Sequence, residues 1–221
     1  MRTISIIYLI LALGLLFISC SFNSSNQPMN TSQAAATQQP AATARPSPID
    51  FTVKDPIPKI KQPTDMTCWA ASATMMQSWK DKATLKIIDV MTKAGNDFKS
   101  KFQANKGLLG SEKPFFLQAL GLKAEPPQNY TVAGWLRLLQ AHGPLWVTTN
   151  EGTTQNFAIH ARILKGIAGD GSPDATFLTF IDPASGLETS ESVTVFTKKI
   201  EDIAKLDLGS GADIRPQVVH F

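Results

Sequence analysis

The sequence predicts an α+β domain, with a helical N-terminal part followed by an antiparallel sheet. Three observations carry this prediction. Apolar residues recur at helical spacing between residues 68 and 142. From Leu145 onward the period shortens, and short runs rich in β-branched and aromatic residues alternate with turn residues. The chain has 221 residues and is 43% hydrophobic, enough for one domain with a sizeable core.

The first predicted helix begins near Cys68. Asp65 and Thr67 are residue types that favour N-cap positions, and they directly precede the run CWAASATMMQSW. Thr131 precedes a second clear helix, VAGWLRLLQAH, which ends at Gly143-Pro144. Between these two, helices are predicted at 84–104, with a break at Gly95, and at 114–120.

The sheet is predicted to follow the last of these helices. Gly169 to Pro173 reads as a turn, and a short final helix is expected at 198–206. The predicted strands cover residues 145–149, 157–167, 175–182 and 192–196.

The N-terminus has the composition of an export signal. Met1-Arg2 is followed by an apolar run from Ile6 to Ile18, which is too short to span a bilayer comfortably. We therefore expect a signal peptide at 1–19, a disordered linker at 20–48 and a folded domain at 49–221.

The end of the apolar run, Ser19-Cys20, resembles the lipobox of bacterial lipoproteins, although Phe17 stands where Leu or Val is usual. The resemblance implies that Cys20 becomes the lipid-carrying mature N-terminus. It implies an exported protein, held in the cell envelope as a membrane-anchored lipoprotein.

The charge pattern and motifs exclude several function classes. The net charge is +3 with scattered basic residues, so we expect no nucleic-acid partner. The sequence contains no G-x-S-x-G elbow, no P-loop, no H-E-x-x-H and no second cysteine for a zinc site. We therefore expect neither a cofactor nor a metal.

Cys68 is the residue that most needs an explanation. If Cys20 carries lipid, Cys68 is the one remaining thiol in an exported domain, where cysteines normally pair. Such a thiol is either an inert core side chain or a reactive group.

Four sequence features favour a reactive Cys68. A helix N-terminus stabilises a thiolate, and the predicted helix begins there. His160, in the strand FAIHARIL, can act as its base, and Asp182, at the end of the strand FLTFID, can orient that imidazole. Gln62, six residues before Cys68, can donate to an oxyanion.

Each assignment has rivals. His142 and His220 are alternative bases, although we expect His142 to sit at its helix end and His220 to fray at the terminus. Gln62 can also be read as an ordinary surface residue before Pro63. The alternatives to Asp182, itself a common turn opener, are Asn150, Asn156, Asp170 and Asp174.

At these residues the sequence resembles the papain-like cysteine peptidases. Gln62-x5-Cys68-Trp69-Ala70 is similar to that family's Gln…Cys-Trp-Ala signature. The segments GPLWV, HARILKGI and FLTFIDPASG are similar to its bacterial branches, among them secreted effector peptidases and bacteriocin-leader peptidases. The resemblance covers most of residues 60–190. It departs at the nucleophile, where Thr67 and Trp69 stand beside Cys68 and the Gly of many relatives is absent.

The resemblance implies a papain-like fold and a function. Cys68 would be the nucleophile, His160 the general base and acid, Asp182 the orienting group and Gln62 an oxyanion donor. The reaction would be cleavage of a peptide or protein substrate through a thioester. Two alternatives stay open: a peptidoglycan amidase or transglutaminase-type acyl transferase with the same residues, and a catalytically silent binding lipoprotein.

Overall fold

The structure, a computed structural model, describes residues 48–153 and 156–221. The predicted signal peptide, Cys20 and nearly all of the predicted linker lie outside the described residues, so lipid anchoring stays a prediction. Within the described part of the chain, no helix combines the length and apolar character needed to cross a membrane.

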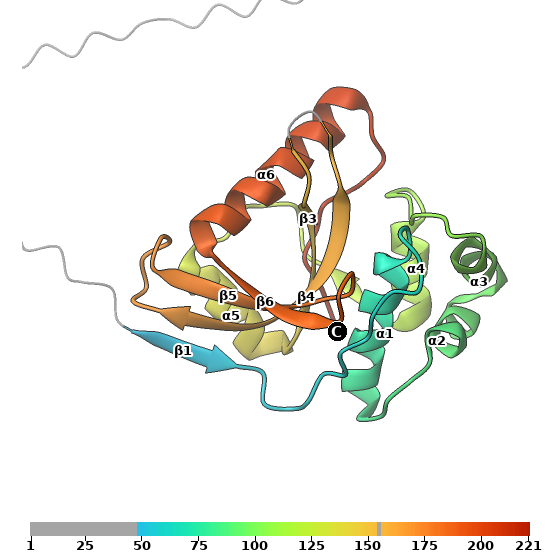
Figure 1. Cartoon of the computed structure of the whole chain (residues 1–221), viewed down its shortest axis with the longest axis horizontal. Coiled ribbons are helices and arrows are strands. Elements are labelled where there is room, and N and C mark those ends of the chain that lie inside the picture. Colours follow the sequence, from blue (N-terminus) through green and yellow to red (C-terminus); the bar gives the residue numbers. More distant parts are fainter. Residues whose placement is uncertain (1–47, 154–155) are drawn as a thin grey trace, which may run out of the picture. The chain divides into compact units, whose positions relative to one another are not determined.

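The fold is α+β, as predicted, and consists of a helical part followed by an antiparallel sheet (Figure 1). The helix that starts with the cysteine, the break at Gly95 and the cap at Thr131 are all confirmed. The helices are α1 (Cys68–Asp81), α2 (Ile87–Ala94), α3 (Asn96–Gln103), α4 (Lys113–Leu120), α5 (Val132–His142) and α6 (Val193–Ser210).

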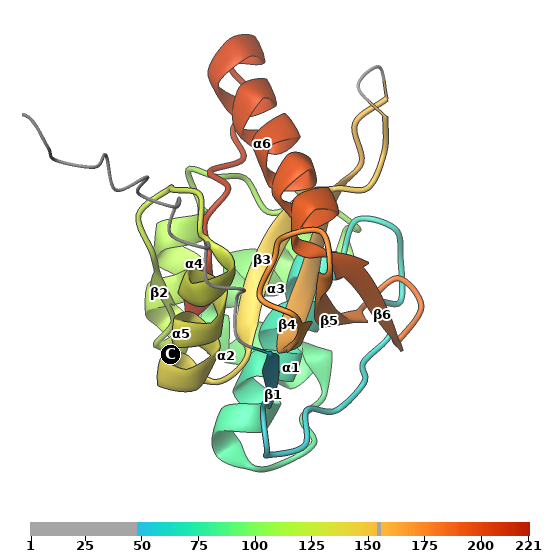
Figure 2. The same cartoon turned by 90° about the vertical axis from the view of Figure 1, so that its left-hand side faces the viewer.

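The described sheet has the strand order β2-β7-β3-β4-β5-β6, with β1 also paired to β4. Figure 2 shows β2 and β6 near its opposite edges. The strands are β1 (Ile49–Thr52), β2 (Lys123–Ala124), β3 (Leu145–Asn150), β4 (Ile159–Gly169), β5 (Thr176–Asp182), β6 (Leu187–Ser192) and β7 (Val219–His220). All pairings are antiparallel. The central strand β4 pairs with β3 along its first half and with β1 along its second, while β5 runs along its other edge.

The predicted strand at 192–196 is wrong, because these residues begin α6. Ser192 is the N-cap, and its side chain accepts a hydrogen bond from the Val195 N–H. Val193 and Phe196, three residues apart, are both buried, as one face of a helix requires. The β-branched residues favoured a strand locally, but packing of this helix against the sheet outweighs that preference.

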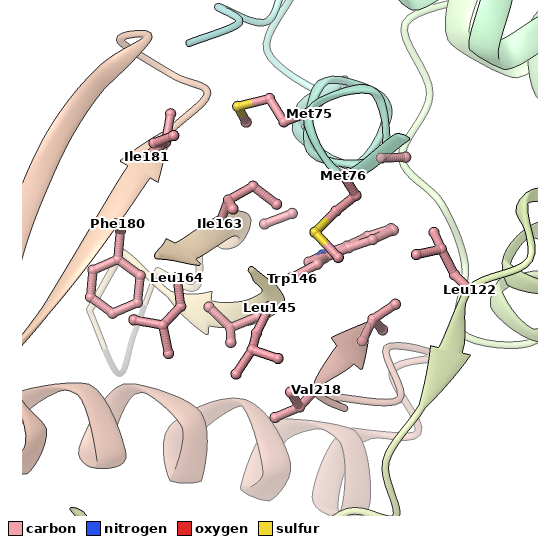
Figure 3. Close-up of a cluster of buried hydrophobic side chains, with 14 of the residues drawn as sticks. Met75, Met76, Leu122, Leu145, Trp146, Ile163, Leu164, Phe180, Ile181 and Val218 are labelled. Atoms are coloured by element: carbon pink, nitrogen blue, oxygen red, sulfur yellow. The ribbon is translucent and has the colours of Figure 1, made fainter. Parts of the chain in front are cut away.

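The core lies between α1 and the sheet on one side and between the sheet and α6 on the other. Figure 3 shows Met75 and Met76 of α1 pointing toward Ile163 and Trp146, with Phe180 and Leu164 on the side of α6. The labelled side chains are 6% exposed or less. Because the side chains of α1 pack closely against the sheet, the position of α1 relative to β3 and β4 is fixed.

A cluster of aromatic rings connects α1 to the other helices and to β3. Phe116 of α4 makes edge-to-face contacts with Trp69, Phe98 and Trp146, at centroid distances of 5.1, 4.9 and 6.3 Å. It therefore supports the helix that begins with Cys68.

We predict that Phe116→Ala destabilises the domain by about 3–5 kcal/mol, because it leaves a cavity where three aromatic rings meet. Phe115 is the matched control: it is the neighbouring phenylalanine and is 69% exposed. Phe115→Ala is expected to stay within about 0.5 kcal/mol of wild type. Urea unfolding measures both, and equal losses in the two variants would contradict the packing described.

Candidate active site

Cys68 is the first residue of α1 and a free, partly exposed thiol. The helix behind it is buried from Trp69 to Ser78. N–H groups in the first turn of a helix have no intrahelical acceptor, and the helix dipole adds partial positive charge there. The fold therefore places the sulfur where an anion is stabilised.

The loop before Cys68 is held by hydrogen bonds to its own residues and to the segment after α3. The buried Thr67 donates from Oγ1 to the Thr64 carbonyl at 2.8 Å. Asn105 accepts from the Met66 N–H at 3.0 Å, and the indole N–H of Trp69 donates to the Lys106 carbonyl at 3.0 Å. Asn105 adopts positive φ, 51°, which Asn tolerates better than most residues. Sequence reasoning missed this support, since it joins residues almost 40 positions apart.

His160 and Asp182 meet across the paired strands β4 and β5. His160 is the second residue of β4, and Asp182 is the last residue of β5. Nε2 of His160 lies 2.6 Å from Oδ1 of Asp182, and the same oxygen accepts the Ala184 N–H at 2.8 Å. Both side chains are largely buried, 13% and 22% exposed.

The side chain of Cys68 interacts with the His160 ring and raises its pKa. Since Nε2 faces Asp182, Nδ1 is the ring nitrogen left for the sulfur. The three residues therefore form a chain of contacts from the start of α1 to the end of β5. This is the arrangement in which a base takes the thiol proton and a carboxylate orients the base.

The pKa of His160 is raised above its ordinary value of 6.5 by these neighbours. Burial alone lowers this pKa, but the hydrogen bond and charge interaction with Cys68 raise it, and those with Asp182 raise it further. The balance favours the imidazolium, the form that pairs with a thiolate.

The rival residues have other partners. Asn150 accepts the Gly152 and Ala158 N–H groups within the loop before β4. Asn156 is in the same loop, where its main-chain N–H donates to Thr153. Asp170 accepts from Ser172 in the turn after β4, and Asp174 accepts from Thr194.

The two rival histidines lie together, in contact with each other. His142 is the last residue of α5, as predicted, and its ring stacks on that of His220 at a centroid distance of 3.7 Å. The expectation that His220 frays is wrong: it lies in β7, paired with Lys123, and is 4% exposed. Strand pairing and burial order this end of the described chain.

Gln62 lies beside the Asp182 turn, because its main-chain N–H donates to the Pro183 carbonyl at 2.8 Å. Its amide nitrogen donates to the carbonyls of Thr64 and Asp65, at 2.8 and 3.0 Å. Its amide oxygen is buried without a hydrogen-bond partner. Both amide N–H groups are thus directed at the loop before Cys68, and an oxyanion would compete with these carbonyls for one of them.

A network of two cations and two carboxylates, of which Arg162 is the buried member, lies two residues along β4 from His160. Arg162 contacts Glu151 at 2.9 Å and Glu191 at 2.5 Å, and Lys199 of α6 contacts the same two carboxylates at 2.7 and 2.6 Å. Burial alone raises the pKa of Glu151, but Lys199 and Arg162 lower it below its ordinary value. The network ties the end of β3 to β4, β6 and α6. Sequence reasoning did not find it.

Comparison with protein families supports a papain-like cysteine protease at family level. The model of one family, described as papain-like cysteine protease AvrRpt2, matches residues 51–201, more than half of the chain. The chain belongs to this family. No individual curated protein matches its sequence.

We predict that the pKa of His160 depends on both of its neighbours. Cys68→Ala removes the interactions that raise the pKa of His160 most, and Asp182→Ala removes the next largest. Each substitution should therefore lower the pKa of His160, because burial still opposes its charged form. The wild-type ring should still be mainly protonated at pH 6.5. Histidine NMR signals followed across pH measure this directly.

Asp174→Ala is the matched control, since Asp174 is a rival carboxylate whose partner is Thr194. It should leave the His160 titration unchanged. A wild-type pKa retained in both Cys68→Ala and Asp182→Ala would mean that the contacts described do not govern the ring.

Proposed function

We propose that this chain cleaves peptide bonds through a thioester formed on Cys68, with His160 as base and acid and Asp182 as orienting group. One observation carries the proposal. The His160 ring is hydrogen-bonded to Asp182 through Nε2, and the Cys68 side chain at the start of α1 interacts with the same ring and raises its pKa. Family membership independently supports a protease and hence a peptide or protein substrate.

The proposed first half-reaction forms the acyl-enzyme. The Cys68 thiolate attacks the peptide carbonyl carbon and forms the S–C bond. The C–N bond then breaks, and His160 gives the thiol proton to the departing amine. Throughout, Asp182 accepts the Nε2–H hydrogen bond and holds the ring toward the sulfur.

The proposed second half-reaction releases the acid. His160, now neutral, takes a proton from a water molecule as that water attacks the thioester. The S–C bond breaks and the thiolate–imidazolium pair returns. An amine in place of water would give transfer instead of hydrolysis, which is how an acyl transferase with the same residues would differ.

The oxyanion has two proposed donors. The main-chain N–H of Cys68 is in the first turn of α1, where it lacks an intrahelical acceptor. The second donor is the Gln62 amide, which gives up or shares one of its bonds to Thr64 or Asp65 when substrate binds. Those bonds meanwhile keep the amide close to the nucleophile loop. Removing one such donor typically costs a factor of about 10²–10³ in kcat.

We predict a graded loss of kcat/KM in four variants assayed on a fluorogenic peptide library. Cys68→Ser and His160→Ala should lose roughly 10³-fold or more, since each removes half of the reactive pair. Asp182→Ala should lose less, and Asp182→Asn least, because an amide carbonyl still accepts the imidazole proton. The charge of the orienting group matters less when the imidazolium is already paired with a thiolate.

Asp174→Ala again serves as the control and should retain wild-type activity. Thermal midpoints of all variants should stay close to wild type, which separates chemistry from unfolding. Activity of Cys68→Ser above about a tenth of wild type, a cost below 1.4 kcal/mol, would end the nucleophile assignment. Product analysis with added amine separates a hydrolase from a transferase.

A further inference from the structure

Three potential metal ligands converge at the edge of the sheet that holds β2 and β7. Glu125 directly follows β2, His142 ends α5 and His220 ends β7. One ligand atom from each lies within 4.8 Å of the other two. Among the described residues, this group lies apart from the Cys68–His160 pair. His220 follows Val219, which pairs with Trp146 near the start of β3, whereas Thr149 near its end pairs with His160.

Both ring nitrogens of His220 lie against oxygen atoms that accept hydrogen bonds. Its Nδ1 lies 2.8 Å from the main-chain oxygen of Phe221, and its Nε2 lies 2.8 Å from Oε1 of Glu125. Both partners are acceptors, but a neutral imidazole carries only one N–H. With Nδ1–H donated to Phe221, the Nε2 lone pair faces a carboxylate oxygen. In this tautomer the Nε2 lone pair and the carboxylate oxygen are both available as ligands to a metal ion.

The donor set matches a transition metal. Two imidazoles and one carboxylate form a common three-ligand set for Zn²⁺, with a water molecule as fourth ligand. A ligating histidine nearly always donates its other N–H to a carbonyl or carboxylate, which fixes the tautomer. The Nδ1 contact of His220 with Phe221 already has this form. We propose that Glu125, His142 and His220 bind a divalent transition metal ion, with Zn²⁺ as the first to be tested.

His142 is the ligand that must move. Its ring plane lies 22° from that of His220 at a centroid distance of 3.7 Å, so the lone pairs of the two rings lie in separate, nearly parallel planes and do not meet at one point. His142 is only partly buried at the end of α5, which leaves its ring free to turn. His220 is fixed by strand pairing and Glu125 by the end of β2. Metal binding would thus fasten the end of α5 to β2 and β7, a structural role remote from the reacting groups.

The test uses the folded protein carrying Cys68→Ala, because the thiolate and His160 of the protease site could bind zinc themselves. Zn²⁺ is titrated in competition with a chromogenic chelator, and the thermal midpoint is measured with and without the metal. We expect one equivalent of Zn²⁺ to bind and to raise the midpoint. Adding His142→Ala should abolish both effects, and adding Glu125→Gln should weaken binding at least about tenfold.

Glu201→Gln is the matched carboxylate control, because Glu201 accepts a hydrogen bond from Asn129 and takes no part in this group. Added to the Cys68→Ala protein, this substitution should leave zinc binding unchanged. Two results would overturn the proposal: no saturable binding at micromolar zinc in the Cys68→Ala protein, or unchanged binding after His142→Ala. In the first case the three side chains form no zinc site.

Discussion

The hydrogen bond between Nε2 of His160 and Oδ1 of Asp182 fixes which face of the imidazole meets the sulfur. Its geometry depends on the pairing of β4 with β5. His160 lies near the start of β4 and Asp182 at the end of β5, and antiparallel pairing brings these two positions to the same end of the sheet. The pairing contains a register shift between Leu164 and Gly166. Since a one-residue shift moves a side chain to the other face of a sheet, this irregularity is part of what aligns the two residues.

The second constraint is that α1 must present its N-terminus to this histidine. Burial of the helix against β3 and β4 sets its position, and the aromatic cluster around Phe116 supports it. Burial also lowers the pKa of His160 and so favours the neutral ring, whereas the proposed catalysis needs the protonated ring. Contacts with a thiol on one side and a carboxylate on the other resolve the conflict in favour of the protonated form. Either contact alone would leave a weaker acid–base pair.

Local patterns in the sequence predicted most of the fold and the central residues of the site. The start of α1 at Cys68, the cap at Thr131 and the break at Gly95 are decided by short-range chemistry, so they could be read from neighbouring residues. The structure of residues 192–196 could not be predicted from neighbouring residues. Their β-branched side chains favour a strand locally, but packing of α6 on the sheet makes this segment begin a helix. Short strands such as β2 and β7 carry too few residues for any periodicity.

Several contacts between residues distant in sequence were not predicted. The support of the nucleophile loop by Asn105, the Arg162 network and the group of Glu125, His142 and His220 each join separate elements. No spacing rule signals them, because their members become neighbours only after the sheet forms. For the same reason, no zinc motif in the sequence points to the last of these groups. The meeting of His160 with Asp182 was expected, because adjacent antiparallel strands could place Asp182, at the end of one, beside His160 in the other.

The most direct test of a preformed Cys68–His160 ion pair is the rate of Cys68 alkylation by iodoacetamide across pH. A free thiol, with a pKa near 8.5, reacts slowly at pH 5 to 6. We expect wild-type Cys68 to react faster than a free thiol in that range. Cys68 of His160→Ala should react no faster than a free thiol, because the substitution removes the base proposed to take the thiol proton. Equal pH profiles for wild type and His160→Ala, both following an ordinary thiol, would contradict the account.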